Sequence, residues 1–439
     1  MKPFLTKFAA DYGMVFVLLL LCAFFSLATI SDQFPTGEAA AVEVAAEVRA
    51  LGPSPRVLIA VGDQPADAAF ATRLEKELAA AGADSAGVAR GEPKSAREAL
   101  ERISAAGGRL DAIACAKSAG AWLVFSDLKT DFPALGSPRV LTPRSYRWPN
   151  FLKTENLLNI ANQIAVIAII AIGMTIVIIT GGIDLSVGSL LALSAVLAAR
   201  FIRDYAGGAR ASGGGMLLAC AAAILACGAV GLFSGLMITR FRIPPFIVTL
   251  AMMLVGSGLA YTLAGGQSIY QLPDSFTWLG RDADLVNVPN AVVLMLLLYA
   301  GAHALMSRMK LGRYFYSVGG NSEAARLSGV PVRRVLMLAY LSSALMAGLG
   351  GVIMASQLKS GSATYGAMYE LYVIAAVVVG GASLSGGGGK MPGTLIGAFT
   401  IAVIQNGMNL TNVESYTQKV VLGLVILGAV LLDKIRHTR

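Results

Sequence analysis

Long apolar runs recur along this chain and limit what it can fold into. Four examples extend from Val15 to Ile30, Ile164 to Ile179, Met216 to Ile238 and Val420 to Leu432. A helix of about 20 such residues crosses a hydrocarbon core about 30 Å thick. The whole sequence is 56% hydrophobic and only 14% charged, whereas about a quarter of the residues of a soluble domain are charged. We therefore predict an all-α, polytopic membrane protein.

About ten transmembrane helices are predicted from the lengths of these runs. The first follows a short basic end, from about Gly13 to Ile30, and its length favours an uncleaved span over a signal peptide. The second and third meet at a Gly-rich break without a proper loop. The nine later spans are expected at 157–179, 185–202, 215–239, 245–264, 291–308, 333–355, 369–383, 393–410 and 417–433.

Basic residues are distributed unevenly between alternate loops. If Lys2 and Lys7 are cytoplasmic, the same side collects Arg240, Arg242, Arg308, Lys310, Arg313, Arg326, Arg333, Arg334, Lys390, Lys434, Arg436 and Arg439. The opposite short loops hold only Arg200, Arg203, Arg210, Arg281 and Lys359. This bias predicts that both termini are cytoplasmic. The net charge of +9 is therefore interpreted as membrane topology, and no nucleic-acid partner is expected.

One stretch, residues 31–149, is soluble in composition. Arg56 to Gly62 reads as a strand and Asp67 to Gly82 as an amphipathic helix, and two further strands and one helix follow. This alternation predicts a βαβαβ unit with a parallel sheet. We divide the chain into the N-terminus with the first span (1–30), an extracytoplasmic α/β insertion (31–149) and a transmembrane domain (150–439). Docking, regulatory and purely structural roles of the insertion stay open.

The sequence lacks the usual signals of sites for ATP, metals and coupling ions. GGASLSGGGGKMPG is not a P-loop, because Leu384 stands where the first glycine is required and Met391 follows Lys390. The four cysteines and two histidines have no metal-ligand spacing. No span carries a string of acidic and basic residues, which disfavours an ion-coupled carrier. We expect neither a catalytic site nor a cofactor on this chain.

Two polar stretches lie within or between the spans. In TGGIDLSVGS, Thr180 to Ser189, paired glycines can break a helix and Asp184 can cap a helix that begins at Leu185. In IQNGMNLTN, Ile404 to Asn412, amide side chains can hold helices together or face a path for hydroxyl-rich solutes. The candidate pathway residues are Asp184, Gln405, Asn406 and Asn409.

A third polar stretch, GGNSEAARLSGVPV, has the signals of a short capped helix. Ser322 or Asn321 can cap its start, Gly329 can adopt the left-handed conformation after its end, and Pro331 prevents continuation. A helix from Glu323 to Ser328 would be marginal alone in water, so another surface must hold it. Its alanines offer a smooth face for a partner, although an amphipathic connector on the membrane would look similar.

Together these stretches resemble the membrane subunit of a bacterial ABC importer of the ribose-type, branched-chain-permease-like sugar permease family. The resemblance covers the first span and the stretch from Asn150 to the C-terminus, which is about two-thirds of the chain. It rests on TGGIDLSVGSLLALSA, RIPPFIVTLAMM, GRYFYSVGGNSEAARLSGV, VVVGGASLSGGGGKMPGTLIGA and NGMNLTNVESYTQKVVLGLVILGAVLLD. It implies a type II importer fold, and residues 31–149 depart from the short connection expected in the family.

The resemblance also implies a function and partners. Two permease copies would form the pathway in the inner membrane, among its lipids, separate ABC ATPase subunits would bind ATP, and a periplasmic binding protein would deliver a sugar or similar polar solute. The family's Glu-Ala-Ala-x-x-x-Gly pattern implies a coupling helix against the ATPase. Its expected contact residues are Asn321, Glu323, Ala324, Ala325, Arg326 and Gly329. A sensor whose outer domain binds a ligand is the rival outside transport.

Overall fold

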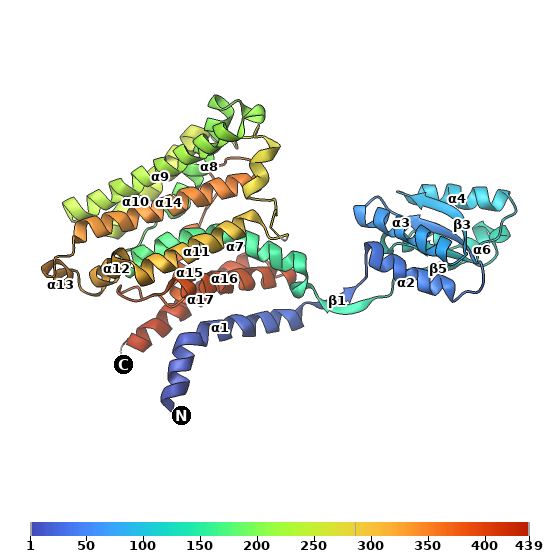
Figure 1. Ribbon diagram of the computed structural model, residues 1–439, viewed down its shortest axis with the longest axis horizontal. Helices are drawn as coiled ribbons and strands as arrows, with labels where there is room; N and C mark the ends of the chain where they lie inside the picture. Colours follow the sequence, from blue (N-terminus) through green and yellow to red (C-terminus); the bar gives the residue numbers. More distant parts are fainter. Residues whose placement is uncertain (1, 286, 438–439) are drawn as a thin grey trace. The chain divides into compact units, whose positions relative to one another are not determined.

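The computed structural model describes residues 2–285 and 287–437, with side chains from 13 to 285 and from 287 to 431. The chain forms two compact units, one over Ile30–Pro149 and one over Met1–Thr29 and Asn150–Arg439 (Figure 1). The terminal charges used in the topology argument (Lys2, Lys7, Lys434, Arg436 and Arg439) lie outside the described side chains.

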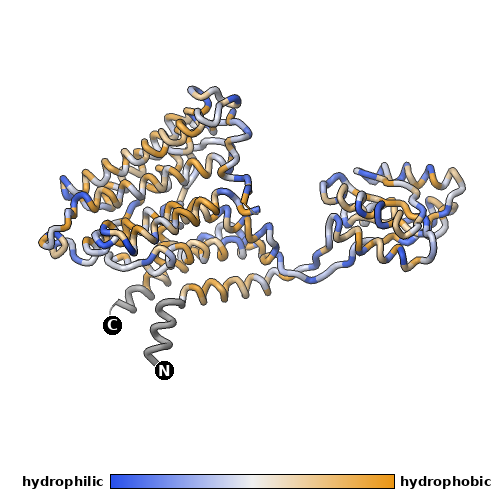
Figure 2. The backbone as a smooth tube through the Cα atoms, viewed as in Figure 1, coloured by the Kyte–Doolittle hydropathy of each residue, from blue (hydrophilic) through white to orange (hydrophobic). Residues whose placement is uncertain are grey.

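The larger unit is helical. Figure 2 shows hydrophobic residues along most of its helix length and hydrophilic residues at many helix ends. Its α-helices are α1 (Lys2–Ala28), α7 (Thr154–Ile179), α8 (Val187–Tyr205), α9 (Gly213–Phe241), α10 (Pro245–Ala264), α11 (Asn290–Arg308), α12 (Lys310–Gly320), α13 (Ser322–Leu327), α14 (Val332–Leu358), α15 (Tyr369–Val379), α16 (Met391–Leu410) and α17 (Ser415–His437).

Five described helices are long and apolar enough to cross a membrane: α7, α9, α10, α11 and α14. Shorter apolar helices lie at Gly13–Ala28, Tyr369–Val379 and Ser415–Leu431. Several spans in one chain make this a polytopic membrane protein, as the hydropathy predicts.

Helix α7 forms the centre of the larger unit. All residues from Ile164 to Ile179 are buried, so the helix is apolar on every face because protein surrounds it. It packs against α14, α16, α15 and α11. A pair of buried hydroxyls joins two of these helices: the Thr175 and Thr394 Oγ1 atoms lie 2.8 Å apart between α7 and α16. We refer below to the Thr154 end and the Ile179 end of this helix.

Non-helical segments at 180–186 and 359–368 lie between apolar helices. Residues 180–186 separate α7 from α8, at the break that the glycines predict. Residues 359–368 are also non-helical, and Gly361 and Gly366 pack against α8. The span expected at 369–383 is wrong at its end, because the helix that begins at Tyr369 has only 11 residues and ends at Val379. Irregular backbone within an apolar bundle is tolerated where protein buries it, and Ser360 and Ser362 are buried.

The smaller unit contains a four-stranded sheet of order β3-β2-β4-β5, parallel at each pairing. Its strands are β2 (Arg56–Val61), β3 (Asp84–Arg90), β4 (Ala112–Cys115) and β5 (Arg139–Leu141). Helices α2 (Gly37–Arg49) and α3 (Pro65–Ala80) pack on one face, and α4 (Pro93–Ala105) on the other. Parallel sheets are covered on both faces in this way.

An antiparallel ribbon carries the chain into and out of the smaller unit. Strand β1 (Ile30–Gln33) pairs with β6 (Tyr146–Pro149), from Ile30 opposite Pro149 to Gln33 opposite Tyr146. The first and last residues of the unit are therefore direct neighbours. Further short elements are α5 (Lys117–Gly120), α6 (Leu128–Asp131), and 3₁₀ turns η1 (Leu123–Phe125) and η2 (Pro133–Leu135).

Candidate functional site

The short helix α13 (Ser322–Leu327) is fixed by its own caps. The Asn321 side-chain oxygen accepts hydrogen bonds from the backbone N–H groups of Glu323, at 3.1 Å, and Ala324, at 2.9 Å. Gly329 has φ +84°, which favours glycine, and its N–H donates to the Arg326 carbonyl. The helix therefore starts at Ser322, one residue before the expected Glu323. Of the two candidate N-caps, Asn321 and Ser322, the cap is Asn321.

The exposed face of α13 differs from the expected smooth pair of alanines. Ala325 is only 6% exposed and packs into the larger unit, whereas Ala324 is exposed. Leu327, which the sequence argument overlooked, is 75% exposed and lies one turn beyond Ala324. The face available to a partner therefore contains Ala324 and Leu327, and their spacing of three residues could have revealed it.

A charged pair lies on the same helix. The Arg326 guanidinium donates to both carboxylate oxygens of Glu323, at 3.1 and 2.5 Å. This hydrogen bonding lowers the pKa of the Glu323 carboxyl below its usual range. Both side chains are more than 60% exposed, so the pair contributes little stability by itself. It leaves two opposite charges beside the apolar residues of the exposed face.

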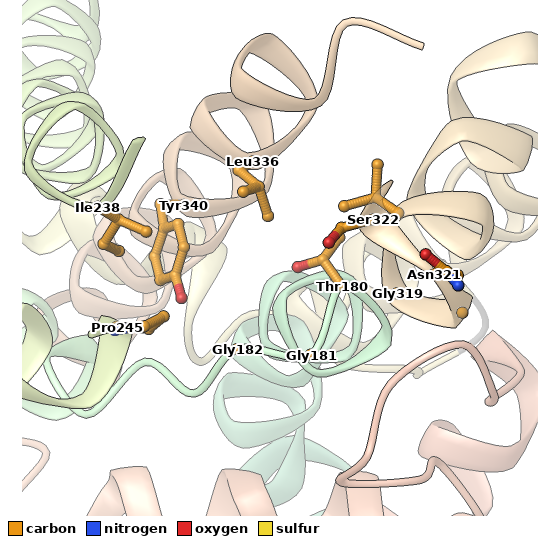
Figure 3. Close-up of a pocket in the computed structure, with 12 residues that line it drawn as sticks. Thr180, Gly181, Gly182, Ile238, Pro245, Gly319, Asn321, Ser322, Leu336 and Tyr340 are labelled. Atoms are coloured by element: carbon orange, nitrogen blue, oxygen red, sulfur yellow. The ribbon is translucent and has the colours of Figure 1, made fainter. Parts of the chain in front are cut away.

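A cavity of about 430 Å³ lies beside the start of α13, and we call it the Tyr340 cavity (Figure 3). Tyr340 is 1% exposed and its hydroxyl has no hydrogen-bond partner among the described residues. Figure 3 shows this hydroxyl directed toward Gly182 and Pro245. The cavity is lined by Thr180, Gly181, Gly182, Ile238, Pro245, Val318, Gly319, Gly320, Asn321, Ser322, Leu336 and Tyr340.

Asp184 lies in the break after α7 and is 2% exposed. Its Oδ1 accepts from the Ser186 N–H, at 3.0 Å, and from the Ser186 hydroxyl, at 2.6 Å. The helix that follows begins at Val187 and not at Leu185, so Asp184 closes a turn just before the helix and is not its N-cap. These bonds suit a structural role in shaping the break.

A second cavity, of about 180 Å³, lies near the Thr154 end of α7, and we call it the glutamine cavity. It is lined by Ile160, Gln163, Ile164, Ile167, Met354, Gln357, Tyr369, Ala402 and Gln405. The Gln357 amide donates to the Asn162 carbonyl at 3.1 Å. The side chains of Gln163 and Gln405 make no hydrogen bond with any residue that the structure describes, so their amides are available to a solute in the cavity.

The other two candidate amides have protein partners. Asn406 and Asn156 exchange side-chain hydrogen bonds of 2.8 and 3.1 Å, which join α16 to α7. The exposed Asn409 side chain accepts a hydrogen bond of 2.8 Å from the partly buried Gln418 amide. Gln405 lines the glutamine cavity, whereas Asn406 and Asn409 are not among the residues that line it.

The four candidate pathway residues are not brought together. Gln405 shares its cavity with Gln163, whereas Asp184 follows the other end of α7. Ile179 is sixteen positions after Gln163 on the same helix, a distance of about 24 Å at 1.5 Å per residue. Within residues 13–285 and 287–431, no three side chains of His, Cys, Asp or Glu lie together in a group that could hold a metal ion.

Comparison with known proteins agrees with this architecture. Residues 156–430 match the family model described as "Branched-chain amino acid transport system / permease component". The "Ribose import permease protein RbsC" of Escherichia coli (strain K12) is 42% identical over 289 residues, covering 65% of this chain and 87% of that protein.

Two further relatives extend this picture. The Bacillus subtilis (strain 168) ribose import permease is 43% identical over 288 residues, covering 65% of this chain and 87% of its own length. The "D-allose transport system permease protein AlsC" of Escherichia coli (strain K12) is 33% identical over 285 residues, covering 65% of this chain and 85% of that protein. No solved structure matches the chain.

Proposed function

We propose, from the premise that this chain belongs to the ribose-type permeases of ABC sugar importers, that it couples ATP hydrolysis on separate subunits to solute entry. It is a multi-pass permease of the bacterial inner membrane and a subunit of a sugar importer. Its relatives are transport proteins and not enzymes. The observation that carries the coupling proposal is the capped helix α13, which leaves Ala324 and Leu327 uncovered.

Helix α13 is the proposed contact with the ATPase. Six residues form too short a helix for stability in water, and caps supply only part of what is missing. An exposed leucine beside a small residue and a charged pair is suited to a groove on another protein. We place Asn321, Glu323, Ala324, Arg326 and Gly329 at or beside this contact, and Ala325 beneath it.

The orientation follows from the same assignment. The ATPase is cytoplasmic, so α13 and the Ile179 end of α7 face the cytoplasm in this proposal. The positive-inside bias supports the same orientation and places both termini inside. The Thr154 end and the α/β unit then face the periplasm, where a solute-binding protein would deliver the sugar. About ten spans, with α8, α15 and α16 among them, complete the proposed topology.

The glutamine cavity is the proposed entry site for the solute. Amide groups donate and accept hydrogen bonds, so Gln163 and Gln405 can both contact hydroxyl groups. The apolar side of the cavity, with Ile164 and Met354, can contact the carbon face of a sugar. Asp184, Asn406 and Asn409 are proposed to shape the path through their protein partners. A second permease copy would complete the transporter, and ATP would bind only to the partner subunits.

Affinity purification from the native membrane tests the coupling proposal. We expect an ABC ATPase subunit to accompany the parent protein and to be lost from a Leu327→Arg variant. Leu123→Arg is the matched control, because Leu123 is 85% exposed but belongs to the α/β unit. Retention of the ATPase by Leu327→Arg at the parental level would overturn the contact. Absence of any ATPase from the parent under mild extraction would overturn the importer mechanism.

A further inference from the structure

Glycines from three distant parts of the chain meet at the Ile179 end of α7. They are Gly181 in the break after α7, Gly319 at the end of α12, and Gly386 and Gly387 in the turn between α15 and α16. We call these four residues the glycine junction. The Gly387 N–H donates to the Ile179 carbonyl at 2.8 Å. The junction thus connects the last turn of α7 to two segments more than 130 residues away.

The backbones approach so closely that side chains are excluded. A Cβ at Gly319 would overlap the Ile179 carbonyl oxygen and lie 2.7 Å from the Gly387 nitrogen. A Cβ at Gly386 would lie 2.8 Å from the Gly319 carbonyl oxygen. The φ angles of Gly386 and Gly387, +86° and +72°, independently favour glycine. A contact between two backbones transmits displacement better than a contact through flexible side chains, because closely packed protein interiors deform little.

The junction is joined directly to α13. Gly319 is two residues before Asn321, whose side chain caps α13. Tyr316, one turn earlier on α12, donates its hydroxyl to the Gly389 carbonyl at 2.8 Å, and this is a second link to the same turn. A displacement of α13 therefore reaches the end of α7 through a few residues of backbone.

Free volume lies beside the junction and the start of α13. The Tyr340 cavity borders Gly181, Gly319 and Asn321, and the Tyr340 hydroxyl beside it has no partner among the described side chains. A rearrangement that reduces the cavity could give this hydroxyl a partner, which a buried polar group favours. The region beside α13 therefore has close backbone contact at the junction glycines and free volume at the Tyr340 cavity.

We propose that the glycine junction is the positioning element that carries movement of α13 to the break between α7 and α8. This inference rests on the proposed coupling role of α13. ATP-driven displacement of α13 moves Gly319 against the Ile179 carbonyl, and the break at 180–186 changes in response. The glycines are then required for the ratio of transport to ATP hydrolysis, and not for binding of the ATPase.

Adjacent glycines provide a matched test. Gly319→Ala introduces the excluded methyl group, whereas Gly320→Ala adds a methyl that meets nothing within 4 Å. Both would be assembled with the ATPase and the binding protein in proteoliposomes, and solute uptake and ATP hydrolysis would be measured together. We expect Gly319→Ala to lower uptake per ATP hydrolysed by roughly two- to thirtyfold, the usual range of coupling effects. Gly320→Ala should keep the parental ratio.

Tyr316→Phe is the second variant, and its result does not depend on whether the fold tolerates the methyl group of Gly319→Ala. It removes only the hydroxyl that donates to Gly389, and we expect a fall in the same ratio. A parental ratio in Tyr316→Phe and in any recovered Gly319→Ala, or an equal fall in Gly320→Ala, would overturn the junction's role. If the parent itself shows no ATP-dependent uptake, the proposed function fails, which is a distinct result.

Discussion

Replacement of Asn321 by alanine tests how α13 is held. The substitution removes the acceptor for the N–H groups of Glu323 and Ala324. Loss of an N-cap typically costs about 1 kcal/mol, within a range of about 0.5–2 kcal/mol. One kilocalorie per mole is roughly a fivefold change in an opening equilibrium. We therefore expect the open population of α13 to rise about fivefold in the permease without its ATPase.

Hydrogen–deuterium exchange of the purified permease measures this change. The amides to follow are those of Ala325, Ser328 and Val330, which donate to carbonyls within or just before α13. Their protection should fall about fivefold in Asn321→Ala. Ser322→Ala is the control, because the Ser322 hydroxyl makes no hydrogen bond with a described residue. Parental protection in Asn321→Ala, or an equal loss in both variants, would refute the assignment of the cap.

Three further predictions concern other parts of the molecule. Gln405→Leu should reduce sugar uptake severalfold while the ATPase still co-purifies, whereas Asn409→Leu, which removes a contact outside the glutamine cavity, should reduce uptake less; equal effects on uptake would contradict the cavity assignment. Gly407→Ala places a methyl in the ring of Phe25 and should destabilise the permease by about 1–3 kcal/mol, seen as a lower melting temperature in detergent. Hydrogen bonding to Arg49 lowers the pKa of the Glu77 carboxyl. The stability that Glu77 contributes is therefore present above the ordinary carboxyl pKa and is lost as pH falls through the lowered folded value. Glu77→Gln should weaken this pH dependence of stability in an acid titration followed by circular dichroism.

Features set by neighbouring residues could be predicted from the sequence. Apolar length predicts the membrane-spanning helices, because the hydrocarbon core imposes a length on each one separately. Asn321, Gly329 and Pro331 predict the limits of α13 to within one residue, because caps act over two or three positions. The glycines after Ile179 predict the break for the same reason.

Features set by distant residues could not be predicted in this way. Asn406 reads as a pathway residue until its partner Asn156, 250 positions earlier, is known. Ala325 appears available in the sequence, but packing against the larger unit covers it. The hydropathy of 369–383 does not reveal that the chain approaches α15 without helical structure. In each case a tertiary contact decides between two uses of the same side chain or segment.

The ribbon of β1 and β6 has a consequence for how such a chain could have arisen. Paired strands are about 4.7–4.9 Å apart, so the α/β unit occupies no more width at its attachment than a tight hairpin would. A gene segment encoding residues 34–145 could therefore be gained or deleted, with a two-residue turn in its place, without changing the distance between Ile30 and Pro149. We therefore expect the permease to keep its fold when a short hairpin turn replaces this unit.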